Sequence, residues 1–375
     1  MKVIKTGSMY RTYGDDLETF EKLPAKVFNL RFNKMSGFYM EHRSDFEIKE
    51  KIYGVHYEKV DKVLRSFDVF ERSLGVILSG AKGIGKSLFA KMLAEQAVKI
   101  GLPVVIVDAF YPGVAAYLES IEQEVLVLFD EFDKSFGGIR QAEGEADAQA
   151  SMLSLFDGTS GGKKLFVITC NDVYRLNEFL INRPGRFHYH FRFNYPSSEE
   201  IEIYLKDKLA EEFYHEIGKV VMFSKKVDLN YDCLRAIAFE LNSGLPFEKA
   251  VLDLNILNMH SDSYNLTLKF TNGEVLTHSD YQIDMFDRSE SECIRMYNKR
   301  GDYVANLRFS VESILSDPES GALVVLPENL EVEWAYDRHW GDKKALDKEI
   351  AANKAKTPRI LVIEREKPRM YHYAV

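Results

Sequence analysis

The sequence has few cysteines and no long apolar run. Its three cysteines, Cys170, Cys233 and Cys293, lie far apart and form no CxxC pair. Closely spaced cysteine pairs mark zinc ribbons and the disulfide frameworks of small secreted domains, so the spacing argues against both classes. No stretch approaches the roughly 18 apolar residues that cross a bilayer, and no charged and then apolar leader opens the sequence. We therefore expect a cytoplasmic protein with no membrane partner.

An excess of positive charge is also missing. Lysine and arginine total 49 against 58 acidic residues, which gives a formal net charge of −9. Proteins that bind nucleic acid through its phosphates generally need a basic surface, so nucleic acid is possible but not favoured as a partner. The 375 residues, of which 46% are hydrophobic and 13% aromatic, predict a folded protein of two or three domains.

Residues 80–87 form a phosphate-binding loop pattern, GxxxxGK[ST], known as Walker A. The loop follows the apolar run 76–78 and precedes a helical pattern over 88–99. Glycines let successive backbone N–H groups face phosphates, the Lys86 ammonium adds a positive charge, and the Ser87 hydroxyl can ligate Mg²⁺. The alternative, a glycine-rich turn without a ligand, is disfavoured by these flanks. The predicted ATP-binding residues here are Gly80, Ala81, Lys82, Gly83, Ile84, Gly85, Lys86, Ser87 and Leu88.

A continuous apolar run over 125–129 ends in Asp130 and Glu131, the Walker B pattern. Such a run is typical of a buried parallel strand. Asp130 is predicted to hold Mg²⁺ together with Ser87, and Glu131 to polarise the water that attacks the γ-phosphate. The alternative is a buried strand that exits into an acidic turn, and the phosphate loop disfavours it.

Two further motifs follow downstream. The buried-strand run 165–170 ends at Asn171, an amide that can orient the attacking water, and residues 182–187 carry Arg183 and Arg186 on a Pro-Gly turn. Together the motifs resemble those of AAA+ ATPases of the AAA clade proper, over about residues 53–258. The short segment between Walker A and Walker B is similar to that of the mitochondrial Rieske-protein translocase, and phage-encoded AAA ATPases are a further comparison.

This resemblance implies the roles of the late motifs. Asn171 corresponds to sensor 1, and Arg183 and Arg186 correspond to arginine fingers that reach the γ-phosphate of the neighbouring subunit. It therefore implies a homo-oligomeric ring, with a hexamer as the expected size. A surface anion patch is the alternative for the two arginines, since guanidinium groups are common on exposed turns.

The predicted fold class is α/β, with the parallel sheet of a P-loop NTPase and an α-helical lid. We expect a β-rich segment over 1–52, the nucleotide-binding domain over 53–196, the lid over 197–260 and a β-rich domain of unreadable role over 261–375. Ser197 is the predicted N-cap of the first lid helix. Period-two alternation around Asn272-Gly273 predicts a hairpin in the last domain.

For each of three segments the sequence leaves two interpretations open. Tyr53 and Gly54 match the adenine-contacting pair of AAA+ relatives loosely, and a turn with a packed tyrosine is equally compatible. Tyr111 lies where ring translocases carry an aromatic pore loop, but an aromatic after a strand is more often core packing. The acidic, glycine-containing stretch 134–150 is either a second pore loop or solvated surface.

The sequence predicts an ATPase that uses ATP and Mg²⁺ and couples hydrolysis to remodelling or translocation of an unidentified protein or assembly. The coupling is implied by the resemblance alone. Two alternatives remain open: a nucleic-acid motor or loader of the initiator type, and a nucleotide-gated binding scaffold with little hydrolysis.

Overall fold

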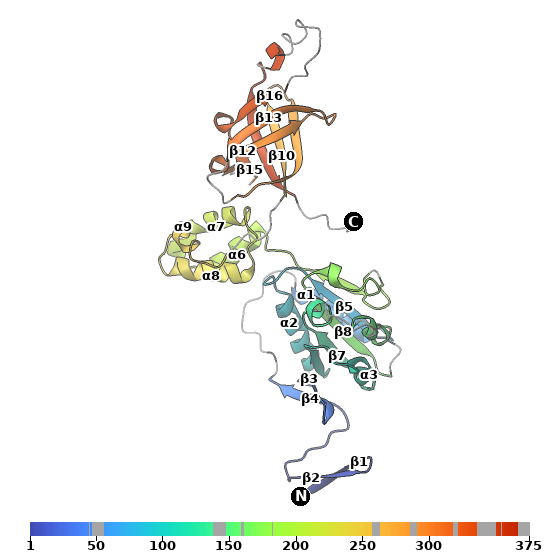
Figure 1. Ribbon diagram of the computed structural model, residues 1–375. Coiled ribbons are helices and arrows are strands. Elements are labelled where there is room, and N and C mark those ends of the chain that lie inside the picture. The colour runs from blue at the N-terminus through green and yellow to red at the C-terminus, as the bar shows by residue number, and fades with distance from the viewer. Residues whose placement is uncertain are drawn as a thin grey trace. The chain divides into compact units, whose positions relative to one another are not determined.

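The computed structural model describes most of the chain. The described residues are 1–44, 46, 56–137, 148–158, 161–181, 183–256, 263–285, 291–317, 322–335, 350–353 and 355–366. The chain divides into two compact units, and Figure 1 labels their helices and strands. The first comprises Met1–Leu209 with Leu229–Ala238, and the second comprises Ala210–Asp228 with Phe239–Val375.

A seven-stranded sheet organises the first unit, in the order β4-β3-β6-β7-β8-β5-β9. Its strands are β3 (Val27–Asn33), β4 (Gly37–Arg43), β5 (Leu74–Ser79), β6 (Val104–Val107), β7 (Val125–Phe129), β8 (Lys164–Cys170) and β9 (Tyr189–Arg192). All pairings are parallel except β3 with β4. Every residue of β5, β7 and β8 is buried, as the continuous apolar runs predict. The predicted α/β class is confirmed.

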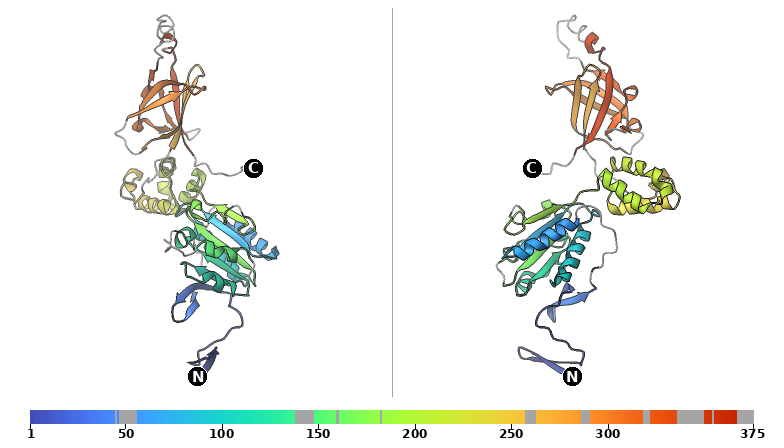
Figure 2. Two further views of the ribbon diagram at one scale, coloured as in Figure 1. Left: turned by 45° about the vertical axis from the view of Figure 1, so that its right-hand side comes forward. Right: turned by 180° about the vertical axis from the view of Figure 1, so that it is seen from behind.

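Helices cover both faces of this sheet. They are α1 (His56–Val69), α2 (Lys86–Lys99), α3 (Val114–Glu119), α4 (Phe132–Ser135) and α5 (Leu153–Phe156). Alternate residues of each strand enter two different cores, because successive side chains point to opposite faces. One core contains the buried side chains of α1 and α2, which lie side by side (Figure 2, right), and the other contains those of α3, α4 and α5.

The strand register brings distant segments to one edge of the sheet. Ser79 of β5 pairs with Cys170 of β8, and Phe129 of β7 pairs with Ile168. The residues that follow these three parallel strands, Gly80, Asp130 and Asn171, therefore lie at the same carboxyl edge. Open α/β sheets bind their ligands at this edge.

Four of the described α-helices follow the central sheet, within the range 197–260 that we expect to form a lid. They are α6 (Ser198–Lys208), α7 (Ile217–Ser224), α8 (Tyr231–Asn242) and α9 (Phe247–Ala250). Ser197 caps α6 as predicted: its hydroxyl accepts the Glu200 N–H, and the Glu200 carboxylate accepts the Ser197 N–H. Among the described residues, no helix combines the length and the apolar character that a membrane crossing requires.

An antiparallel eight-stranded sheet makes up the β-rich C-terminal region, in the order β14-β15-β17-β10-β11-β12-β13-β16. Its strands are β10 (Ser263–Phe270), β11 (Val275–Gln282), β12 (Ser291–Tyr297), β13 (Tyr303–Ser310), β14 (Leu315–Ser316), β15 (Leu323–Val325), β16 (Glu331–Trp334) and β17 (Pro358–Arg365). The predicted hairpin joins β10 to β11, and Gly273 has the positive φ of +83° that its turn needs. Arg365 at the end of β17 forms a bidentate ion pair with Asp228.

The N-terminal residues supply β-structure of two kinds. β1 (Lys2–Thr6) and β2 (Met9–Tyr13) form a separate two-stranded hairpin. β3 instead pairs in parallel with β6, so it continues the central sheet, and β4 forms the sheet's edge. Residues 27–43 are thus part of the sheet that carries the motif-bearing strands.

Candidate nucleotide-binding site

The phosphate-binding loop connects β5 to α2. Gly80, Gly83 and Gly85 have φ angles of +140°, +73° and +101°, which side chains other than glycine rarely adopt. At Gly80 an added Cβ would also lie 2.3 Å from the Phe193 carbonyl oxygen. The loop leads into the N-terminus of a 14-residue helix, whose free N–H groups favour an anion.

Lys86 is buried at this loop, with 7% of its surface exposed. Its ammonium donates to the carbonyl oxygens of Gly80 and Ala81 and to Oδ1 of Asn171, at 3.0 Å in the last case. Burial lowers the pKa of Lys86 because the charged form loses hydration. The oxygens that accept hydrogen bonds from the Lys86 ammonium among the described residues are neutral, so this dehydrated cation is suited to a phosphate ligand.

The Asn171 amide supplies a second donor for an anion. Its Nδ2 is buried and, within the part of the chain that is described, has no hydrogen-bond partner. An unsatisfied buried donor costs about 1–3 kcal/mol, so a ligand oxygen there would offset a real penalty. The loop geometry, Lys86 and this amide therefore fit the phosphates of ATP.

Thr169 in β8 holds both acidic residues at the end of β7. Its hydroxyl donates to Oδ1 of Asp130 at 2.7 Å and accepts the Glu131 backbone N–H at 2.8 Å. Glu131 has φ of +46°, a left-handed conformation that is strained for glutamate. Thr169 was not predicted, because the contact joins two strands that lie 38 residues apart in the chain.

The Glu131 carboxylate is half-exposed and bonds to the Lys134 ammonium at 2.5 Å. This hydrogen bond is the main reason why the pKa of Glu131 lies below its ordinary value. The Asn171 amide also lies close enough to lower that pKa, although it makes no hydrogen bond of normal geometry with the carboxylate. Glu131 is thus ionised at neutral pH and lies near Asn171.

Asp133 is a further residue that the motifs did not identify. It is only 2% exposed, and its Oδ2 accepts the backbone N–H groups of Asn171 and Asp172, at 3.1 and 3.2 Å. The available signal was an acidic residue two positions after Glu131, where the structure has helix α4. Asp133 fixes the backbone that carries the Asn171 amide.

The two arginines differ in environment. Arg183 is exposed, whereas Arg186 is 8% exposed and bonds through Nε and Nη2 to both carboxylate oxygens of Asp157. Arg186 Nη1 also donates to the Phe179 carbonyl oxygen. In this structure only Arg183 has a side chain available to a neighbouring molecule, and Arg186 would have to leave Asp157 to reach one.

We expect Asp157→Ala to destabilise the fold more than Arg186→Ala does. Loss of Asp157 leaves the buried Arg186 guanidinium without its ion-pair partner, which should lower the free energy of unfolding by about 2 kcal/mol. Loss of Arg186 leaves a half-exposed carboxylate that water can solvate, which should lower it by about 1 kcal/mol. Arg186 lowers the pKa of Asp157 below its unfolded value of about 3.9. The stability that this ion pair contributes is therefore fully present above about pH 4 and is lost at lower pH. Urea unfolding of both variants measures the order, and equal losses would contradict it.

The lid helix α8 meets the phosphate-binding loop. The Tyr231 N–H donates to the Gly83 carbonyl oxygen at 3.1 Å, and Asn230 Nδ2 donates to the Lys82 carbonyl oxygen at 3.2 Å. Asn230 also caps α8, because its Oδ1 accepts the Cys233 N–H. The contact was not predicted from the motifs, since it depends on how the helix packs.

The remaining predicted residues divide into two groups. Ser87 is exposed at the start of α2, and Leu88 packs against the adjacent core. Tyr53 and Gly54 lie outside the described residues, as does most of the acidic stretch, residues 138–147. The Tyr111 ring contacts Phe32 and Phe38, with centroids 5.7 and 6.4 Å away, so it packs against the β3–β4 hairpin. Within the described residues, no three His, Cys, Asp or Glu side chains cluster as a metal site.

Comparison with known proteins agrees with this geometry. Protein SAV of Sulfolobus acidocaldarius is 26% identical over 245 residues, which cover 56% of this chain and 30% of that protein. The cell division cycle protein 48 homolog of Archaeoglobus fulgidus is 26% identical over 211 residues, which cover 50% of this chain and 29% of the homolog. The ATP-dependent zinc metalloprotease FtsH of Aster yellows witches'-broom phytoplasma is 30% identical over 159 residues, which cover 37% of this chain and 23% of FtsH.

The chain therefore spans less than a third of the length of these relatives. Residues 76–195 match the family described as "ATPase family associated with various cellular activities (AAA)". The matched residues run from within β5 to beyond β9, and so include both Walker motifs, Asn171 and the two arginines. Residues 76–195 of this chain are thus similar to the domain that defines the AAA family.

Proposed function

We propose that the chain binds ATP with Mg²⁺ and hydrolyses the γ-phosphate bond. The observation that carries the proposal is that three adjacent parallel strands bring Lys86, Asp130 and Asn171 to one edge of the sheet. Asp130 and Asn171 directly follow β7 and β8, and Lys86 begins the helix after the loop that follows β5. Lys86 and the loop N–H groups bind the phosphates, with Ser87 and Asp130 as the residues that would hold Mg²⁺. When bound, this ion would neutralise charge on the phosphate oxygens.

Hydrolysis needs a positioned water as well as bound phosphates. Glu131, ionised and fixed by Thr169, accepts a hydrogen bond from this water and orients it for attack. The Asn171 amide, held by Asp133, helps to orient the same water. Tyr53 and Gly54 remain the proposed adenine contacts.

The reaction also needs a positive charge near the transferred phosphoryl group. We assign this role to Arg183, because its side chain is exposed and can enter a neighbouring subunit's site. Such an arginine stabilises charge that builds up in the transition state. The active form is then a homo-oligomeric ring, with six subunits as the expected number, and Arg186 contributes directly only if its ion pair with Asp157 opens.

The concentration dependence of turnover tests this proposal. Specific ATPase activity per chain should rise about tenfold or more as dilute chains assemble, since each site needs an arginine from a neighbour. Lys86→Ala is the control, because it should lose ATP affinity and show no activity at any concentration. A specific activity that is constant from monomer to assembly would contradict an arginine supplied by a neighbour.

The work coupled to hydrolysis is proposed to be remodelling or translocation of a protein or assembly in the cytoplasm. The support is similarity to a relative whose name describes an ATP-dependent protease, together with the net charge of −9. A Glu131→Gln chain with bound ATP should retain its substrate for identification. If single-stranded or duplex DNA stimulated turnover instead, with steep salt dependence, the coupled substrate would be nucleic acid.

A further inference from the structure

The β1–β2 hairpin exposes apolar side chains on both of its faces. The exposed fractions are 53% for Val3, 58% for Met9 and 67% for Tyr10. A two-stranded hairpin is at best marginally stable in water when its faces are unpacked. Exposed apolar groups that gather on one small element are typical of an interaction surface.

The hairpin is also strongly cationic. Residues 2–13 contain Lys2, Lys5 and Arg11 and no acidic residue, although the chain as a whole is acidic. Residues opposite each other in an antiparallel pair share a face, and Ile4 pairs with Arg11 while Lys2 pairs with Tyr13. One face of the hairpin thus combines Ile4, Met9 and Tyr13 with the Arg11 guanidinium.

A large pocket in the first unit has the complementary character. Its volume is about 1330 Å³, above the range of about 300–1,000 Å³ for small-molecule sites, so it suits a peptide segment. The lining loops around Leu102 and Glu122 come directly before β6 and β7. The pocket therefore lies at the amino edge of the parallel strands, away from the phosphate-binding loop.

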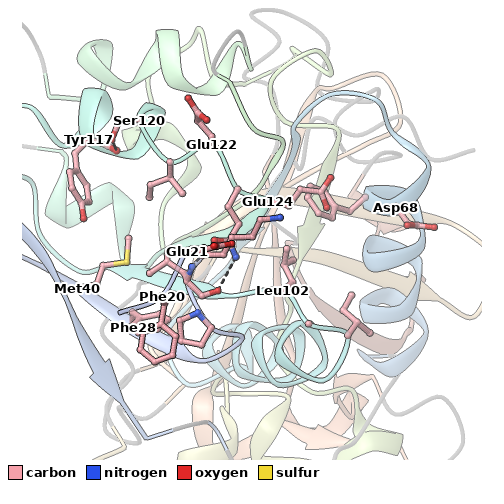
Figure 3. A pocket seen from close by; sticks show the side chains of 18 of the residues that line it. Phe20, Glu21, Phe28, Met40, Asp68, Leu102, Tyr117, Ser120, Glu122 and Glu124 are labelled. Atoms are coloured by element: carbon pink, nitrogen blue, oxygen red, sulfur yellow. Dashed lines mark hydrogen bonds between the residues drawn. The ribbon is translucent and has the colours of Figure 1, made fainter. Parts of the chain in front are cut away.

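Apolar and acidic side chains both line the pocket (Figure 3). Phe28, Met40 and Leu102 are among its apolar lining residues. Four carboxylates line the pocket against one lysine, Lys22; they are Glu21, Asp68, Glu122 and Glu124. Glu124 pairs with Lys163 at 3.2 Å, which leaves an acidic excess from the other three.

We propose that the β1–β2 hairpin of one chain docks into this pocket of a second copy, through the face that carries Ile4, Met9, Arg11 and Tyr13. The apolar side chains of this face meet the apolar lining residues of the pocket, and Arg11 meets its carboxylates. A second copy is the occupant, since a short tether gives the chain's own hairpin a millimolar effective concentration, and yet Met9 and Tyr13 of this face lie exposed, at 58% and 38%. The inference rests on the proposed function in that the ring supplies the neighbouring copy.

Two sets of charge reversals test the contact. Arg11→Glu should weaken self-association about tenfold or more, because like charges then face each other, and Glu122→Lys with Asp68→Lys should do the same from the pocket side. Lys5→Glu is the matched control, since it makes the same charge change on the opposite face of the hairpin. Light scattering after size-exclusion chromatography measures the assembly. An equal loss from Lys5→Glu would overturn the assigned face.

Mixing the two weakened proteins distinguishes a hairpin that docks into a second copy from one that docks within its own chain. An Arg11→Glu hairpin matches a Glu122→Lys, Asp68→Lys pocket, so the mixture should assemble about as well as the parent protein. A third protein combines Arg11→Glu, Glu122→Lys and Asp68→Lys in one chain. If assembly recovers in this protein but not in the mixture, the hairpin docks within its own chain and the proposal is wrong. If neither recovers, the pocket is not the docking site.

The same proteins separate this inference from the proposed ATPase function. The pocket lies at the opposite sheet edge from Lys86, so every charge-reversed variant should bind a fluorescent ATP analogue with parental affinity. Absence of ATP binding by the parent protein would refute the proposed function but leave the association measurement intact. Normal ATP binding with unaltered association in the charge-reversed variants would refute the docking proposal alone.

Discussion

Arg183→Ala should slow ATP turnover by about a thousandfold while leaving ATP affinity nearly unchanged. Arginine fingers contribute roughly 10³-fold to 10⁵-fold to the rate, because they interact with charge that develops only in the transition state. The exposed position of Arg183 on the turn before Phe187 leaves the guanidinium able to act on a neighbouring site. Steady-state turnover and fluorescent-nucleotide binding measure the two effects separately.

Arg175→Ala is the matched control for this prediction. Arg175 is also exposed and pairs only loosely with Asp172, at 3.7 Å, so its loss should change turnover less than twofold or so. Turnover of Arg186→Ala, measured at a temperature where the fold is intact, shows whether Arg186 also acts in catalysis despite its ion pair with Asp157. Parental turnover by Arg183→Ala would eliminate it as a finger.

Glu131→Gln should retain ATP binding and lower turnover by about a hundredfold or more. The amide has nearly the same shape as the carboxylate but cannot accept a proton from the attacking water, and positioned bases contribute about 10²-fold to 10⁴-fold. The half-exposed carboxylate bonds to Lys134 and lies outside the hydrophobic cores, so the substitution should have little effect on folding. Pre-steady-state and steady-state phosphate release measure the loss.

Glu95→Gln serves as its control. Glu95 lies on α2 and pairs with Lys99 at the surface, so the same chemical change there should leave turnover within about twofold of the parent. If Glu131→Gln hydrolysed ATP at the parental rate, the water would have to be oriented by another group. If instead the parent protein bound ATP but showed no measurable turnover, the chain would be a nucleotide-gated scaffold.

The central strands were predictable because each carries its evidence locally. The runs that became β5, β7 and β8 are mostly apolar, and burial on both faces favours this composition. The phosphate-binding loop was readable for the same reason, since its chemistry lies within eight consecutive residues. Ser197 and Glu200, three residues apart, likewise indicate the start of α6.

Contacts between distant segments could not be read in this way. Thr169 with Asp130, Asp133 with the Asn171 backbone and Asp157 with Arg186 each join residues 29 or more positions apart. Nothing local distinguishes these side chains from ordinary polar residues. They become identifiable only when the strand register is known, because the register decides which polar groups meet in a buried environment.

The same reasoning applies to the N-terminal strands. Alternation over 27–40 indicated strands, but not the sheet to which they belong, because the parallel pairing of β3 with β6 joins residues about 77 positions apart. Tyr111 illustrates the related difficulty for single side chains. From the sequence, core packing was the more common role for an aromatic after a strand, and a pore loop remained open. The Tyr111 ring contacts the rings of Phe32 and Phe38, which lie on that same hairpin.

The most direct test of the central claim, that each site takes its arginine from a neighbouring chain, is to mix two inactive proteins. Glu131→Gln chains retain Arg183, and Arg183→Ala chains retain Glu131, so about a quarter of the interfaces in randomly mixed rings should contain both groups. ATP turnover of the mixture should therefore recover to a substantial fraction of the parental rate. A mixture that co-assembles in size-exclusion chromatography and still fails to hydrolyse ATP would contradict the account.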